Sequence, residues 1–128
     1  RGRCTLLSTG ELSALTALGT GIRWIEKGRA KHVLVVVGDA AGPAAAQLGP
    51  DYTAQSAAAA YLLSGEGNGR ELADVRFNTE PGEARILEPG GLKYGTTFVD
   101  ALEPLLLGDE KTRVHGSAGG QSVSFRIG

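Results

Sequence analysis

The stretch GRAKHVLVVVGD, residues 28–39, decides the fold of this chain. Between Lys31 and Gly38 it holds an almost unbroken β-branched apolar run. Such a run is typical of a strand that is covered on both faces, as in a parallel sheet flanked by helices. The sequence therefore predicts a buried strand at His32–Val37.

A helix is predicted immediately before this strand, over Ser8–Lys27, with Gly28 ending it. Its apolar side chains recur at three- and four-residue steps, as on one face of a helix, at Leu12, Leu15, Leu18, Ile22 and Ile25. Gly19 and Gly21 each cost about 1 kcal/mol relative to alanine inside a helix, so they indicate close packing or a break. A helix that leads into a buried strand predicts an α/β layered fold.

Two more strands are predicted in the part of the chain up to residue 78. Residues 38–55 contain several glycines and prolines and indicate a loop. Ala57–Leu63 is apolar throughout and predicts a second buried strand, whereas Glu71–Asn78 alternates and predicts a more exposed one. Residues 79–91, with two prolines and three glycines, are predicted to link the halves 1–78 and 92–128 of a single domain.

The second half is predicted to hold one helix and a closing hairpin. Residues 96–107 are apolar at helical spacing, and Pro104 is expected to bend or end this helix early because proline lacks the backbone N–H. Two short strands follow, Thr112–His115 and Ser122–Ile127, around a glycine-rich turn at Gly116–Gly120.

Composition excludes several classes of function. The 128 residues fit one domain, and 41% hydrophobic with 21% charged residues is ordinary for a soluble globular protein. The longest apolar run falls far short of the roughly 20 residues that span a bilayer, so no membrane segment is predicted. The net charge of -1, with 13 scattered basic residues, gives no electrostatic footprint for nucleic acid.

Cys4 is the single cysteine, which excludes an internal disulfide and a cysteine-based metal cluster. The sequence also has no metal-spaced His/Cys cluster, P-loop or dinucleotide fingerprint, so no metal or cofactor is predicted. It shows no apolar core of a signal peptide, which predicts a cytoplasmic protein. Methionine is absent even at position 1, which indicates a fragment, a processed form or a chain with further ends.

The order of helix, GRAKHVLVVVGD, short loop and DYTAQSAAAAYLLSG (residues 51–65) resembles the middle of β-ketoacyl-[acyl carrier protein] synthase III, a condensing enzyme of the thiolase superfamily. The resemblance implies a thiolase-like α/β layered fold, partial or reduced, with a mixed sheet and a buried helix. The short connection between the two strands favours the type III branch, because the elongating synthases have a longer insertion there. In the family the nucleophilic cysteine opens the buried helix, and its place corresponds to Glu11, 17 residues before Gly28.

Two C-terminal stretches carry the same resemblance. GLKYGTTFVDALEPLL, residues 91–106, is similar to the family's segment around GNTSAAS, and Thr96 stands where the family has an asparagine that stabilises the thioester oxyanion. RVHGSAGGQSVSFRI, residues 113–127, is similar to the closing strand pair with its glycine-rich turn beside the active site. His115 stands at that turn and is the third candidate site residue, although the family has no catalytic histidine there.

The departures from the family pattern indicate a loss of catalysis. A helix N-terminus activates a cysteine thiolate, but glutamate cannot replace that thiolate as the carrier of an acyl group. The region that would hold the family's catalytic histidine is reduced to the predicted linker around residues 80–91. The resemblance therefore implies a non-catalytic or auxiliary subunit in fatty-acid or polyketide-type acyl chain biosynthesis. Such a subunit would form a homodimer or heterodimer with a ketosynthase-like chain and would meet acyl-CoA or acyl carrier protein.

Two other interpretations stay open. The chain is alternatively part of an active acyltransferase or ketosynthase, with catalytic residues in segments outside this chain or in a partner. It is alternatively a non-enzymatic interaction module. Glu11 would then be an ordinary carboxylate in a first helical turn, which the helix dipole stabilises by about 0.3 to 1 kcal/mol.

Overall fold

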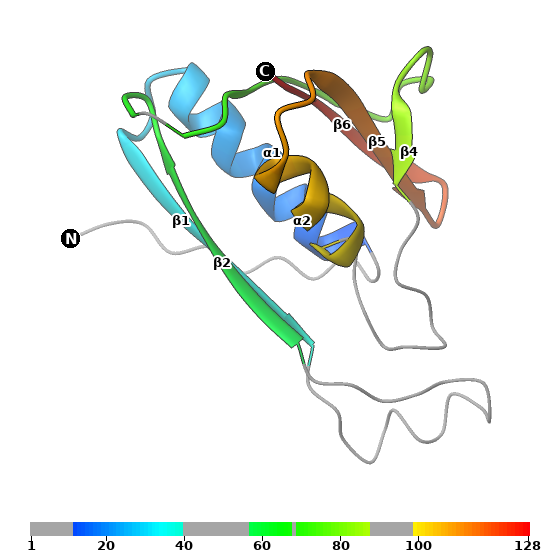
Figure 1. The fold of residues 1–128 in the computed structure, drawn as a ribbon, viewed down its shortest axis with the longest axis horizontal. Coiled ribbons are helices and arrows are strands. Elements are labelled where there is room, and N and C mark those ends of the chain that lie inside the picture. The colour runs from blue at the N-terminus through cyan, green and yellow to red at the C-terminus, as the bar shows by residue number, and fades with distance from the viewer. Residues whose placement is uncertain (1–11, 40–56, 68, 88–98) are drawn as a thin grey trace.

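The structure is a computed structural model that describes residues 12–39, 57–67, 69–87 and 99–128. Its strands form a two-stranded sheet, β1-β2, and a four-stranded sheet with the order β3-β6-β5-β4 (Figure 1). The elements in chain order are α1 (Ser13–Glu26), β1 (His32–Asp39), β2 (Ala57–Ser64), β3 (Leu72–Phe77), β4 (Arg85–Leu87), α2 (Val99–Leu107), β5 (Thr112–Ala118) and β6 (Gln121–Ile127). Helices packed on sheets confirm the predicted α/β class.

Helix α1 lies between the two sheets (Figure 1). A Cβ atom added to Gly19 would lie 3.1 Å from Val123 Cγ1 in the four-stranded sheet. One added to Gly21 would lie 2.9 Å from Leu63 Cδ1 and 3.2 Å from Val33 Cγ1 in the two-stranded sheet. The two glycines thus let the sheets approach the helix from opposite sides, which confirms the close packing predicted for them.

The end of α1 is set by Gly28. The Lys27 and Gly28 amides donate to the carbonyls of Arg23 and Ile25, and Gly28 has a φ of +73°, which favours glycine. The chain then turns back into β1. The predicted helix is confirmed over residues 13–26, and its predicted start at residues 8–11 lies outside the described residues.

The prediction that β1 is covered on both faces in a parallel sheet is wrong. β1 pairs with β2 in antiparallel register, from His32 opposite Ser64 to Asp39 opposite Ala57. Val35, on the face toward α1, is 5% exposed, whereas Val36 on the other face is 67% exposed. Leu34 and Leu62 are exposed beside Val36, so the prediction that Ala57–Leu63 is a buried strand is also wrong for the outer face of β2. Apolar residues occupy both faces of this strand, but the described part of the chain covers only one of them.

The four-stranded sheet is mixed. β3 and β5 both run antiparallel to β6, and β4 runs parallel to β5. Its inner face packs on α1 and supplies much of the core, with the fully buried side chains Val114, Val123, Phe125 and Ile127. Leu102 and Leu105 of α2 complete this core.

Strand β4 corrects the prediction that residues 79–91 are a linker. Residues 85–87 pair with residues 114–116 of β5, and Leu87 is 4% exposed. Three residues are too few to show a periodicity, and the surrounding prolines and glycines dominate the local pattern. The strand forms because Leu87 gains a buried place beside β5.

Pro104 does not end α2, which corrects a second prediction. The helix continues through Pro104 to Leu107, and the Gly108 amide donates to the Pro104 carbonyl at 3.1 Å. Proline removes one backbone hydrogen bond, but Leu102 and Leu105, on either side of it, are almost completely buried. Tertiary packing outweighs the local penalty here.

The closing hairpin is confirmed, but its turn is shorter than predicted. Gly119 and Gly120 have φ values of +59° and +79°, and they join β5 directly to β6. Two successive residues with positive φ match a type I′ turn, whose twist suits a two-residue hairpin. Residues 116–118 therefore belong to β5, and His115 lies in the middle of a strand.

Candidate functional site

Two of the three predicted site residues cannot be placed. Glu11 and Thr96 lie outside the residues that the structure describes, as does Cys4. The described chain begins at Leu12, which is 1% exposed and directly precedes α1. The start of this helix is therefore anchored in the core.

His115 is the one predicted site residue that the structure describes. It lies opposite Ser124 of β6 and level with Ile86 of β4, so it does not stand at the glycine turn as predicted. It is only 4% exposed, and its Nδ1 atom is buried with no hydrogen-bond partner among the described residues. A buried polar atom without a partner costs about 1 to 3 kcal/mol. Such an atom calls for an explanation beyond packing.

The neighbours of His115 form a polar face that sequence analysis missed. Because side chains alternate along a strand, His115 shares the outer face of the sheet with Arg113 two residues away. Across the sheet, Ser124 lies between His115 of β5 and Arg76 of β3. The signal is present in the sequence, where polar residues alternate as Arg113, His115, Ser117 and then Ser122, Ser124, Arg126.

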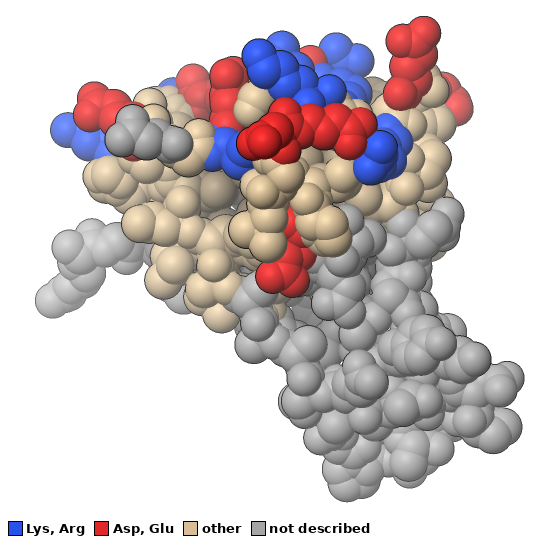
Figure 2. Space-filling view, viewed as in Figure 1, with Lys and Arg blue, Asp and Glu red and all other residues tan. Residues whose placement is uncertain are grey.

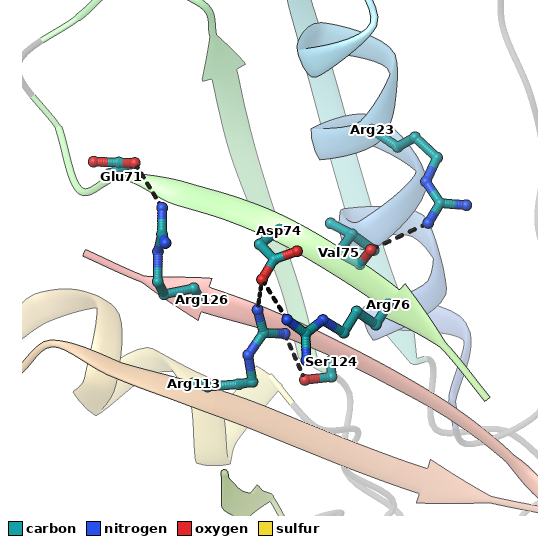
Figure 3. Close-up of polar contacts among 8 residues, drawn as sticks. All are labelled: Arg23, Glu71, Asp74, Val75, Arg76, Arg113, Ser124 and Arg126. Carbon is teal, nitrogen blue, oxygen red and sulfur yellow. Dashed lines mark hydrogen bonds and ion pairs between the residues drawn. The ribbon is translucent and has the colours of Figure 1, made fainter. Parts of the chain in front are cut away.

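Asp74 joins two arginines on this face (Figure 3). Its Oδ2 accepts hydrogen bonds from Arg113 and, at 3.0 Å, from Arg76. Arg113 also donates to Ser124 Oγ at 3.0 Å. Asp74 has a φ of +55° and lies where the pairing of β3 with β6 shifts register. The bulge thus places one extra carboxylate among the arginines.

Positive charge is in excess on this outer face. Burial lowers the pKa of the Arg113 guanidinium; Asp74 acts against this shift, and Arg76 and Arg126 add to it. Arg126 pairs with Glu71 at 3.3 Å (Figure 3). Three guanidinium groups therefore share two carboxylates.

A separate pocket of about 680 Å³ lies at the C-terminal end of α1. The 14 residues of the helix span about 20 Å, so the pocket is far from Leu12 at the start of α1. Ile22, Ile25, Leu63 and Leu72 provide apolar walls, and Glu26, Glu66 and Glu71 provide carboxylates. Arg70 is also in the wall, but it donates to the carbonyls of Gly108 and Glu110. The size is typical of ligand pockets.

Charged side chains gather along the end of the molecule where the C-terminus lies (Figures 1 and 2). Acidic and basic groups alternate there, and most of the other described surface in this view is uncharged.

Among the described residues, no group of three or more His, Cys, Asp and Glu side chains could hold a metal ion. No helix in the described ranges is long and apolar enough to cross a membrane.

Comparison of the chain with protein-family models, with curated proteins and with solved structures finds no match.

Proposed function

We propose that this protein is a non-catalytic or auxiliary subunit that resembles a β-ketoacyl synthase and acts with a partner chain in fatty-acid or polyketide-type acyl chain biosynthesis. The observation that carries the proposal is the placement of α1 between two sheets, followed by Gly28 and β1. A helix covered in this way, feeding a strand through a glycine, is the setting that the family gives its nucleophile. Here Glu11 precedes that helix in the sequence.

Chemistry supports inactivity at position 11. A thiolate attacks the thioester carbonyl, displaces the CoA or carrier thiolate and holds the acyl group until condensation. A carboxylate at the same position is a far weaker nucleophile toward a thioester and would form a reactive anhydride. The chain would therefore recognise an acyl partner without keeping its acyl group. We also propose that the protein is located in the cytoplasm.

The exposed face of the β1-β2 sheet supports a role beside another chain. Leu34, Val36 and Leu62 expose 64%, 67% and 73% of their surface there, which is unusual for adjacent apolar side chains of a monomer. Proteins commonly cover such patches with a partner. This feature is compatible both with an auxiliary subunit and with an interaction module.

Labelling with an acyl thioester tests the inactive-subunit proposal. The chain is incubated with radiolabelled acyl-CoA and, separately, with acylated carrier protein, and stable label is located by peptide mapping. We expect no stable label on the chain. Stable labelling of Glu11 or Cys4 would contradict the proposal. Turnover that appears only with a second chain, and is lost on mutating a cysteine of that chain, would favour the active acyltransferase alternative.

Thermal unfolding separates the proposal from an interaction module with no acyl chemistry. A ligand that binds only the folded state stabilises it by about 2.7 kcal/mol at 100 times its dissociation constant. We expect acyl-CoA or acylated carrier protein to raise the melting temperature and free CoA to raise it less. An unchanged melting temperature with all three would favour the interaction module.

A further inference from the structure

The outer face of the four-stranded sheet carries mostly hydrogen-bond donors. Arg76, Ser124 and His115 form one row across β3, β6 and β5, because the strand register sets them side by side. Arg113 lies two residues from His115 on the same face and donates to Ser124 Oγ at 3.0 Å. Three donor side chains, those of Arg76, His115 and Arg113, therefore surround Ser124, whose hydroxyl is a fourth donor.

The charges of these side chains are not balanced. Asp74 is the carboxylate that both Arg76 and Arg113 contact, which leaves one positive charge in this group of three. Arg76 uses one terminal nitrogen on Asp74, and its side chain is 54% exposed. Within the described ranges, its other nitrogens have no protein partner. The guanidinium thus retains donors that face solvent.

Burial distinguishes this group from an ordinary charged surface. The Arg113 side chain is 20% exposed, and His115 is 4% exposed with its Nδ1 unpartnered. An ion pair that only stabilises the surface, such as one between Asp74 and an arginine, has no need of a buried histidine without a hydrogen-bond partner nearby. An oxyanion over Ser124 would accept hydrogen bonds from Arg76 and Arg113 and would compensate the excess charge. His115 would provide a donor from the floor of the site.

We propose that Arg76, Arg113, Ser124 and His115 form a binding site for a phosphate-type oxyanion on the outer face of the four-stranded sheet. Guanidinium groups suit this ligand because their planar N–H pairs match two oxygens of a phosphate. Asp74 holds Arg76 and Arg113 in position from one side of the site. The proposal is independent of the acyl function, because it uses no residue near the start of α1.

Binding is measured by titrating the chain with inorganic phosphate and following the ring nitrogens of His115 by NMR. Sodium chloride at matched ionic strength is the blank. Saturable shifts of the His115 resonances with phosphate, and not with chloride, are expected. A parallel titration with O-phosphoserine identifies the source of the ligand: tighter binding indicates a phosphate monoester on a larger molecule, and equal binding indicates the free ion. No saturable shift with either would overturn the proposal.

Three variants separate a site from a general charge effect. Arg76→Gln should weaken phosphate binding at least about tenfold, because it removes charged hydrogen bonds to the ligand. Arg85→Gln is the matched control, since Arg85 is 50% exposed, pairs with Glu110 and lies on β4. It should change binding less than about twofold, because Arg85 is level with the core residue Val114 and so lies on the opposite face of the sheet from His115. Asp74→Asn keeps a hydrogen-bond acceptor but removes a negative charge, so it should tighten binding.

The outcomes are decisive because all three positions are exposed enough to tolerate substitution. Circular dichroism and thermal unfolding check that each variant is folded. Equal weakening by Arg76→Gln and Arg85→Gln would overturn the site, as would weaker phosphate binding to a folded Asp74→Asn variant. Saturable binding that falls with Arg76→Gln and rises with Asp74→Asn would establish it.

Discussion

At the scale of single residues, Gly19 and Gly21 decide how closely the two sheets approach α1. The sequence predicts that another element packs closely against both glycines, because glycine inside a helix is costly unless it allows such an approach. The partners could not be predicted, since Leu63 and Val123 are distant in the sequence. The polar row beside Ser124 was missed for a similar reason: it forms only when three strands adopt one register.

Substituting Gly21→Val tests the close approach of the β1-β2 sheet. A Cβ there would lie within 3.2 Å of Val33 and Val35 and closer still to Leu63, so the larger side chain forces the sheet away. We expect a loss of about 1 to 3 kcal/mol in the free energy of unfolding, measured by urea denaturation. Gly67→Val is the control, because nothing lies within 4 Å of that position. A Gly21→Val variant as stable as the control would refute the packing described.

The hairpin turn is tested at Gly119. Its φ of +59° is strained for most residues and especially for a β-branched one. Gly119→Val should cost about 1 to 2 kcal/mol, whereas Gly119→Asn should stay within about 0.5 kcal/mol of the original because Asn-Gly suits a type I′ turn. Thermal unfolding of the two variants provides the comparison. Similar stabilities would mean that the turn has another conformation.

At the scale of elements, long periodic segments were predictable and short or isolated ones were not. The helix before Gly28, the strands β2 and β3 and the closing hairpin follow from spacing and turn residues. β4 could not be predicted because prolines and glycines surround its three residues. The effect of Pro104 was overestimated because the burial of Leu102 and Leu105, which holds the helix together, depends on tertiary packing. The candidate site was predictable to the same extent. His115 was predicted as a site residue, but its position in the middle of β5 was not.

The single covered face of β1 is tested by two neighbouring substitutions. Val35→Thr buries a hydroxyl beside α1 and should cost about 1 to 3 kcal/mol. Val36→Thr makes the same chemical change on the exposed face, and it should stay within about 0.5 kcal/mol of the original. Urea denaturation of the isolated chain gives both values. Equal losses would show that both faces of β1 are covered, as the sequence pattern had predicted.

At the scale of the whole molecule, the architecture is a helix held between two sheets. The outer face of the two-stranded sheet is apolar and exposed, and the outer face of the four-stranded sheet is polar. The α/β class follows from the sequence, whereas a mixed sheet was expected only from the resemblance to condensing enzymes, which also gives the buried helix its proposed meaning. The open apolar face of β1-β2 and the arginine-rich outer face of β3-β6-β5 emerge only after folding. They supply the two surfaces through which the molecule would meet a partner and an oxyanion.

We propose that Glu11 corresponds to the nucleophile position of a condensing enzyme and that the chain no longer carries acyl groups. The most direct measurement is the acylation of a Glu11→Cys variant by acyl-CoA, followed by intact-mass spectrometry in a Cys4→Ser background. A helix N-terminus lowers the pKa of a cysteine and speeds its reaction, so the variant should be acylated about tenfold faster than the exposed control Glu66→Cys. The parent Cys4→Ser chain should stay unmodified. Acylation of Glu11→Cys no faster than the control, or a stable acyl group on the parent chain, would contradict the account.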